Sequence, residues 1–165
     1  MCKKHGNRSQ ASILVVDNDR SNALTLSSIL VGQGYEVATA FSGREAIALA
    51  AGFSPDLLVS EVCIAEMSGV EVAARVVEMA PHCSVLFLSG LASMNDALNE
   101  APEHLIYSFT SKPLHPLDFQ NAVAYMPAAV ITEHDSPVMV ANHGNPVSHA
   151  VTLRPAQTGL IFTEA

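Results

Sequence analysis

Ile13-Leu14-Val15-Val16-Asp17-Asn18-Asp19 is a short apolar run that ends abruptly in carboxylates and an amide. Three more runs have this form, and they are Leu57-Leu58-Val59-Ser60 before Glu61, Val85-Leu86-Phe87-Leu88 before Ser89, and Leu105-Ile106-Tyr107-Ser108-Phe109 before Lys112-Pro113. Uninterrupted apolar runs of this length are typical of parallel strands buried on both faces. Because parallel strands end at the same edge of a sheet, the polar residues that follow them are expected to lie together.

Helical patterns separate the runs, which is typical of βαβ units. A further strand is predicted at Glu36–Ala40, and a weakly marked helix at about 93–100. Caps and breakers mark the other helices. Ser21 is predicted to cap a helix that ends at Gly32 and Gly34, and Pro116 is predicted to begin a helix that reaches about Met126. Two capping boxes are predicted to begin the other helices. Ser42-Gly43-Arg44-Glu45 begins a helix that runs through Ala51 and is closed by Gly52, and Ser68-Gly69-Val70-Glu71 begins one that ends before Pro81.

The composition indicates one globular domain with short extensions. The 165 residues are 49% hydrophobic and 15% charged, with a formal net charge of −8. Residues 11–126 hold thirteen acidic and four basic residues, which argues against a basic face for nucleic acid. No apolar run approaches the length of a membrane span. Three cysteines without metal spacing are interpreted as reduced thiols of a cytosolic protein.

Five segments, in this order and spacing, resemble the receiver domain of bacterial two-component response regulators. They are 13–19, Pro-Asp-Leu-Leu-Val-Ser-Glu at 55–61, Met-Ser-Gly at 67–69, Leu-Phe-Leu-Ser-Gly at 86–90 and Ser-Lys-Pro at 111–113. The resemblance covers residues 12–126, and residues 1–11 form an N-terminal arm. It implies a flavodoxin-like α/β fold, with a doubly wound parallel sheet of five strands in the order 2-1-3-4-5 and helices on both faces.

The resemblance also implies a role for each residue at the sheet edge. Asp17 matches the first of two acids that help to hold Mg²⁺, and the backbone carbonyl of Cys63 matches a further metal ligand. Ser89 and Lys112 match the hydroxyl and the lysine that bind phosphoryl oxygens. Phe109 matches an aromatic residue that swings with activation, and a plain core role is an equal alternative for it.

Two central positions depart from the family pattern, because Asn18 replaces the second acid and Glu61 replaces the aspartate that accepts phosphate. Mg²⁺ requires a strict octahedral shell of hard oxygen ligands. A neutral amide in place of a carboxylate predicts weak Mg²⁺ binding or none, with Asp17, Glu61 and the Cys63 carbonyl as the remaining candidates. No other cofactor is expected. The following loop also departs, since Ile64-Ala65-Glu66 stands where the family has Met-Pro-Gly.

Glu61 is one methylene longer than an aspartate, so its carboxylate is expected to project toward Ser89 and Lys112. Phosphoryl transfer depends on alignment, and a misplacement of about 1 Å can cost around a hundredfold in rate. The Glu61–Lys112 pair is therefore predicted to hold the domain in one state. A glutamate carries about −1, against roughly −1.5 to −2 for a phosphate, so it mimics phosphorylation only in part.

Two other acids have simpler interpretations. Asp56 lies five residues before Glu61, roughly 16 Å away at about 3.3 Å per residue, and therefore at the opposite end of the sheet. It is expected to be solvated or to form a turn. Asp19 is expected to be a turn acid, and residues 17–19 together have the alternative role of capping the first helix.

Residues 127–165 form a C-terminal tail that contains four prolines and few charges. Val138–Ala141 and Val147–Val151 flank a turn-like segment at 142–145, which favours a hairpin or another extended structure. A linker without fixed structure is the alternative. The tail is too short and too poor in lysine and arginine for a usual DNA-binding domain.

The sequence therefore predicts a cytoplasmic receiver protein that works by protein–protein contact and is not an enzyme. The expected partner is a histidine kinase, another regulator or a second copy of the chain, and neither nucleic acid nor a membrane. The alternative is a phosphorylation-competent receiver that accepts phosphate from a histidine kinase with Mg²⁺. A small-molecule binder is a third interpretation, which the lack of a glycine-rich loop disfavours.

Overall fold

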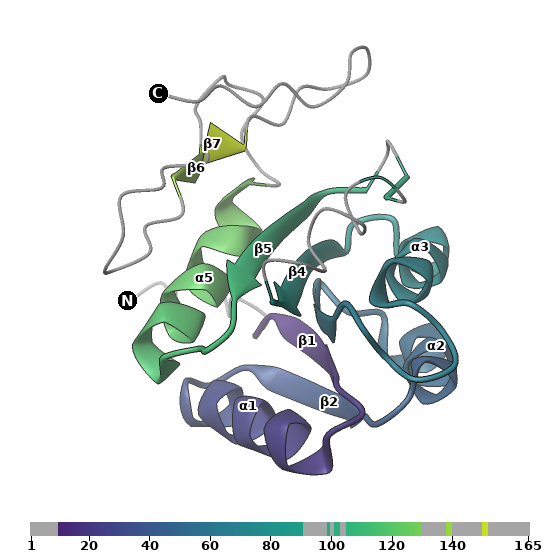
Figure 1. Cartoon of the computed structure of the whole chain (residues 1–165), viewed down its shortest axis with the longest axis horizontal. Helices are drawn as coiled ribbons and strands as arrows, with labels where there is room; N and C mark the ends of the chain where they lie inside the picture. Colours follow the sequence, from purple (N-terminus) through teal and green to yellow (C-terminus); the bar gives the residue numbers. More distant parts are fainter. Residues whose placement is uncertain are drawn as a thin grey trace, which may run out of the picture.

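Five parallel strands form the central sheet in a computed structural model that describes residues 10–90, 99, 101–102, 105–129, 138–139 and 150–151. The strands are β1 (Ser12–Val16), β2 (Glu36–Ala40), β3 (Leu57–Glu61), β4 (Ser84–Ser89) and β5 (Tyr107–Ser111). Their order is β2-β1-β3-β4-β5, which confirms the predicted fold class (Figure 1). The apolar runs are buried as expected, since every residue from Leu57 to Ser60 and from Ser84 to Ser89 is buried.

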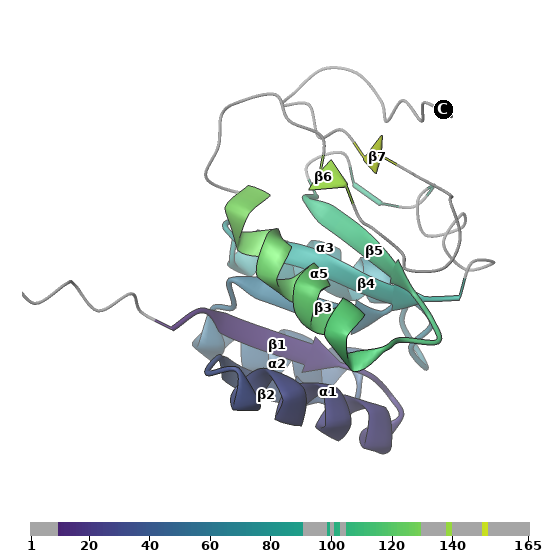
Figure 2. The same cartoon turned by 90° about the vertical axis from the view of Figure 1, so that its left-hand side faces the viewer.

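Helices cover both faces of the sheet, and they are α1 (Arg20–Gly32), α2 (Gly43–Phe53), α3 (Gly69–Met79) and α5 (Pro116–Ala129). Figure 2 shows α1 and α5 in front of the sheet and α2 and α3 behind it. Two apolar cores result. One core lies between the sheet and helices α2 and α3 and includes Phe87. The other lies between the sheet and helices α1 and α5 and includes Phe119.

The predicted caps of α2 and α3 are confirmed, whereas that of α1 is wrong. Ser42 accepts the N–H of Glu45 at 3.2 Å, and Ser68 accepts the N–H of Glu71 at 3.1 Å. The N-cap of α1 is Asp19 in place of Ser21, because the Asp19 carboxylate already accepts the N–H of Ser21 at 2.9 Å. A carboxylate at this position stabilises the first turn by about 1 kcal/mol.

Three element boundaries also differ from the predictions. Helix α2 continues through Gly52 to Phe53, and Ser54 then ends it with a left-handed φ of 50°. Helix α5 extends three residues past Met126, through Pro127, and ends at Ala129. Strand β5 begins at Tyr107, two residues later than expected.

In the tail, β6 (Val138–Met139) pairs antiparallel with β7 (Ala150–Val151). Both short strands lie within the two stretches that were expected to be extended. The predicted helix at about 93–100 falls outside the described residues except for Asn99. Among the described residues, no helix is long and apolar enough to cross a membrane.

Candidate functional site

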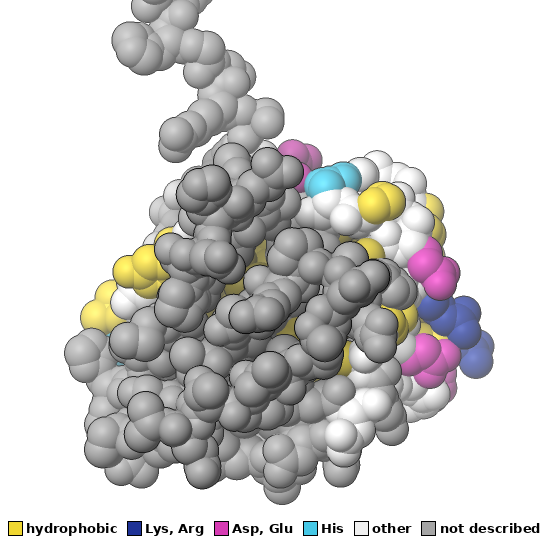
Figure 3. All heavy atoms as spheres, turned by 90° about the horizontal axis from the view of Figure 1, so that it is seen from above, with side chains coloured by type: hydrophobic (Ala, Val, Ile, Leu, Met, Phe, Trp, Pro, Cys, Tyr) yellow, Lys and Arg dark blue, Asp and Glu magenta, His cyan; other side chains and the backbone are white. Residues whose placement is uncertain are grey.

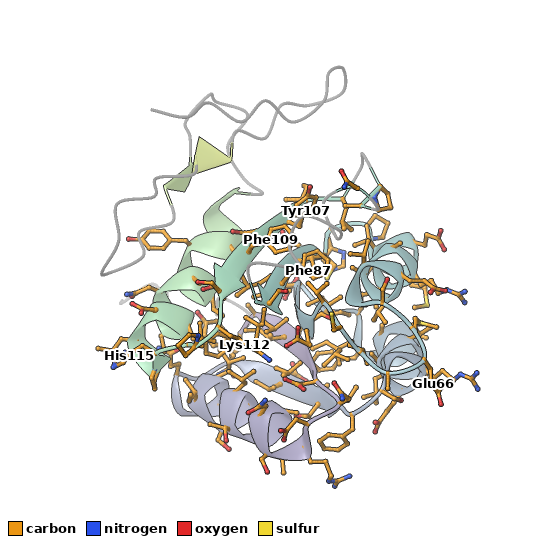
Figure 4. The ribbon with its side chains drawn as sticks, viewed as in Figure 1. Glu66, Phe87, Tyr107, Phe109, Lys112 and His115 are labelled. Atoms are coloured by element: carbon orange, nitrogen blue, oxygen red, sulfur yellow. The ribbon has the colours of Figure 1, made fainter. Side chains whose placement is uncertain are left out.

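The carboxyl ends of β1, β3 and β5 bring three charged side chains into contact. Asp17 directly follows β1, Glu61 is the last residue of β3, and Lys112 directly follows β5. The ammonium of Lys112 forms an ion pair and hydrogen bond with Oε2 of Glu61, and its Nζ lies 3.6 Å from Oδ2 of Asp17. Figure 4 shows Lys112 at this end of the sheet, between α5 and α1. The predicted proximity of the three residues is therefore observed.

Both oxygens of the Glu61 carboxylate have partners within the chain. Oε1 accepts the backbone N–H of Val62 at 2.9 Å and that of Cys63 at 3.4 Å, while Oε2 accepts from Lys112. The Glu61 side chain is 12% exposed. The carboxylate is thus turned back onto its own loop, and it is not presented to solvent as a nucleophile.

The pKa of Lys112 is raised above its ordinary value. Partial burial alone lowers it, but the hydrogen bond with Glu61 and the negative charges of Glu61 and Asp17 outweigh that effect. Because the pKa is higher in the folded state, the stabilisation is fully present below the ordinary lysine value. It is lost only as the pH rises through the raised pKa, so the ion pair persists throughout the neutral range.

Asp17 is 2% exposed, and only one of its two carboxylate oxygens has a hydrogen-bond partner among the described residues. Its Oδ1 accepts the N–H of Asp19 at 2.8 Å, and its Oδ2 is buried without a hydrogen-bond partner among the described residues. Among the described residues, Lys112 is the cation paired with Oδ2, and it is already hydrogen-bonded to Glu61. Two carboxylates therefore share one ammonium, which leaves a net charge of −1 in this cluster.

The neighbouring predicted residues take less part in the cluster. Asn18 is exposed. Ser89 is buried, and its hydroxyl donates to the carbonyl of Gly90 at 3.0 Å. Glu61 thus reaches Lys112, as expected, while the Ser89 hydroxyl is directed at the backbone carbonyl of Gly90. Asp56 lies at the other end of β3, as predicted, where it accepts the N–H of Ser12 at 2.8 Å.

Phe109 lies within a closed group of three aromatic rings. Its ring stacks on Phe87, with centroids 5.2 Å apart, and meets Tyr107 edge-on at 5.5 Å. Phe87 and Tyr107 also contact each other at 6.0 Å (Figure 4). Each aromatic pair of this kind contributes roughly 0.5–1.5 kcal/mol beyond its buried area, which favours the present position of Phe109.

The donor set does not fit an octahedral Mg²⁺ site. Glu61 has both oxygens engaged, Asn18 offers only a neutral amide, and a lysine ammonium already lies beside Asp17. Among the described residues, no group of three or more histidine, cysteine, aspartate or glutamate side chains could hold a metal ion. Within the part of the site that the structure describes, the buried Oδ2 of Asp17 is a feature that a cation would satisfy.

Gly69 supports the site in a way that the sequence pattern did not reveal. It begins α3, and its N–H donates to the carbonyl of Val62 at 2.7 Å. A Cβ at this position would lie 2.0 Å from the backbone oxygen of Glu61. Only glycine permits this close approach of α3 to the end of β3.

The loop after β3 contains one left-handed residue, Glu66, with a φ of 71°. Its carboxylate lies 3.7 Å from Nε of Arg44, in an exposed ion pair that adds little stability. Replacing Glu66 with glycine removes the steric cost of this conformation, and we expect a gain of about 0.5–1 kcal/mol in the free energy of unfolding. Urea denaturation checks this result. Glu66→Ala is the control, because it loses the ion pair, keeps the Cβ and should change stability little.

The two described cysteines differ in burial, which predicts a difference in reactivity. Burial raises the pKa of the Cys83 thiol to about 12, whereas Cys63 is exposed. Because only the thiolate reacts, iodoacetamide at pH 8 should modify Cys63 and leave Cys83 intact in the folded protein. Peptide mass spectrometry checks the pattern, and Cys83 should react once urea unfolds the chain. Equal labelling of both thiols without denaturant would contradict the burial of Cys83.

Comparison with known proteins identifies the class to which this fold and site belong. The family model described as the response regulator receiver domain matches residues 13–124. The chain belongs to the response regulator receiver family of two-component signalling. Receiver domains of this family interact with kinases and other regulators.

The curated relatives are longer proteins. The chain is 34% identical over 122 residues to the transcriptional regulatory protein ZraR of Escherichia coli K12. The aligned residues make up 74% of this chain and 27% of ZraR. It is 32% identical over 104 residues to the transcriptional regulatory protein GlrR of the same organism. These residues make up 63% of this chain and 23% of GlrR. The chain thus spans about a quarter of the length of these relatives.

Solved structures share the fold. A response regulator receiver protein from Sinorhizobium medicae WSM419 is 25% identical, with a TM-score of 0.65 over 74% of this chain and 98% of that one. A CheY-like receiver domain from Methanospirillum hungatei JF-1 is 22% identical, with a TM-score of 0.65 over 74% of this chain and 97% of that one. The second likeness concerns the fold alone.

Proposed function

We propose that this receiver domain signals without being phosphorylated, through contacts with other proteins. The observation that carries the proposal is the complete engagement of the Glu61 carboxylate by Lys112 and by two backbone N–H groups. A carboxylate in this arrangement is a fixed ligand of the lysine. It resembles a phosphoryl group in sign and position but carries less charge, so it holds the domain in one state.

On this proposal the domain is not an enzyme and requires no cofactor. The mismatch between the donor set and octahedral Mg²⁺ supports this part, since phosphoryl transfer to a carboxylate relies on metal ions to neutralise charge. The family membership supports a cytoplasmic location and a protein partner, such as a histidine kinase, another regulator or a second copy of the chain. The acidic domain, at −9 over residues 11–126, does not favour nucleic acid or an anionic membrane.

One observation favours the alternative, a receiver that accepts phosphate from a histidine kinase with Mg²⁺. The buried Oδ2 of Asp17 lacks a hydrogen-bond partner, which a metal ion would supply. Ser89 and Lys112 are also present at the edge of the sheet. The alternative requires Glu61 to release Lys112 before it could attack phosphorus.

Incubation of the full chain with acetyl phosphate and Mg²⁺, followed by intact mass spectrometry, separates the two functions. We expect the mass of the wild-type chain to stay unchanged over hours. A phosphoryl adduct that peptide mapping places on Glu61 would contradict the proposal. Calorimetric titration with Mg²⁺ is the companion measurement, and tight binding by the wild-type chain would also count against it.

A further inference from the structure

A cavity of about 300 Å³ lies on the α1 and α5 side of the sheet, beside the cluster of charges. Its walls are largely apolar, with Leu26 and Ile29 from α1 and Phe119 from α5. Asp17 and Lys112 line its polar end. The cavity is at the small end of the range for ligand pockets, and it combines an apolar wall with a charged end.

The helices around this cavity differ in charge from the rest of the domain. Arg20 is the only charged residue of α1, and Asp118 is the only charged residue of α5. These helices instead expose large apolar side chains, which are Leu24 and Val31 on α1 and Leu117 and Tyr125 on α5. In Figure 3, which views the molecule from above, hydrophobic side chains show at both edges, and the Lys and Arg side chains in view lie at the right-hand edge, on the side of α2 and α3. A face with few charges and several exposed apolar side chains is suited to contact with another protein.

The charges at the polar end specify what this cavity accepts. Asp17 and Glu61 share the single ammonium of Lys112, so the cluster keeps a net charge of −1. Oδ1 of Asp17 already accepts the N–H of Asp19, and only Oδ2 lacks a hydrogen bond. A guanidinium prefers to engage both oxygens of a carboxylate, whereas an ammonium is a compact charge that needs one.

We propose that the cavity receives a lysine side chain of a partner protein. The stem of the lysine packs on Leu26, Ile29 and Phe119, and its ammonium balances the excess charge of Asp17. The exposed apolar side chains of α1 and α5 contact apolar residues on either side of that lysine. This inference rests on the proposed function, since it assigns the chemistry of the partner that a phosphorylation-independent receiver would contact.

Selection from a random library of 12-residue peptides tests the site with the full chain as the target. Peptides selected by the wild-type chain are expected to contain a lysine flanked by apolar residues. Replacing that lysine with acetyllysine keeps most of the stem but removes the charge, and it should weaken binding about tenfold in fluorescence anisotropy, which corresponds to about 1.4 kcal/mol.

Two variants remove one negative charge each and serve as a matched pair. Asp17→Asn should abolish the preference for lysine over acetyllysine, whereas Glu78→Gln, on α3 across the sheet, should leave it intact. If Asp17→Asn fails to fold, Thr25→Lys replaces it. Thr25 is exposed and lines the cavity, so a lysine there supplies the missing ammonium from the chain itself and should compete with the peptide.

Several outcomes would overturn the lysine site. They are the selection of no peptide, equal affinity for the acetylated form, and an equal loss of preference in Asp17→Asn and Glu78→Gln. Acetyl phosphate labelling of the same preparations keeps the two proposals apart. An unlabelled chain without lysine preference refutes only the site, whereas a chain labelled on Glu61 refutes the phosphorylation-independent function.

Discussion

The double variant Glu61→Asp, Asn18→Asp is expected to become labelled by acetyl phosphate in the presence of Mg²⁺, at least about a hundredfold faster than the wild-type chain. The shorter side chain withdraws the carboxylate by one methylene, away from the ammonium of Lys112. The second change adds a carboxylate next to Asp17, and the two acids then provide hard ligands for the metal. Intact mass and calorimetric Mg²⁺ titration measure both effects.

The single variants divide this expected gain into its parts. Glu61→Asp alone supplies the attacking carboxylate without the added metal ligand, and Asn18→Asp alone supplies the ligand without a free carboxylate. Each should therefore show much less labelling than the double variant. Adding Lys112→Ala to the double variant should abolish labelling again, because the ammonium would bind the phosphoryl oxygens. A double variant that remains unlabelled and binds no Mg²⁺ would show that more than these two positions has changed.

Gly69→Ala is expected to lower the free energy of unfolding by about 3 kcal/mol, which lowers the melting temperature by roughly 10 °C. The added Cβ would lie 2.0 Å from the carbonyl oxygen of Glu61, and this neighbour is backbone that cannot rotate away. The N-terminus of α3 must shift, and the bond from the Gly69 N–H to Val62 is then strained or lost. Urea and thermal denaturation measure the loss.

Gly52→Ala provides the control for this effect. Gly52 lies in α2, and a Cβ there would meet no atom within 4 Å. Since alanine favours a helix over glycine, this variant should gain roughly 0.5–1 kcal/mol. A Gly69→Ala protein that loses less than about 1 kcal/mol would contradict the close approach of α3 to β3.

The fold was predictable because local and tertiary signals agree in this chain. The apolar runs coincide with β1 and β3, and the serine caps at Ser42 and Ser68 start α2 and α3. The first helix shows where such reasoning fails, since Asp19 and Ser21 are both good caps and the sequence alone does not rank them. In the structure Asp19 is the cap, and a local hydrogen bond from its N–H to the Asp17 carboxylate holds it in place.

The candidate site was predictable only in part. The pairing of Glu61 with Lys112 follows from the length of the glutamate side chain and the shared edge of the sheet. The direction of the Ser89 hydroxyl does not follow, because it depends on a rotation about one bond. The approach of Gly69 to Glu61 and the cavity beside Asp17 also escaped prediction, since both depend on distances between elements that no sequence pattern encodes.

The ion pair between Glu61 and Lys112 has a consequence for the rim of the sheet. The two residues belong to β3 and to the end of β5, with β4 between them, so their side chains bridge across a whole strand. Among the residues that the structure describes, strand β5 is the terminal strand of this sheet and pairs only with β4. The bridge therefore anchors the outermost strand to an inner one, which discourages fraying at that end of β5.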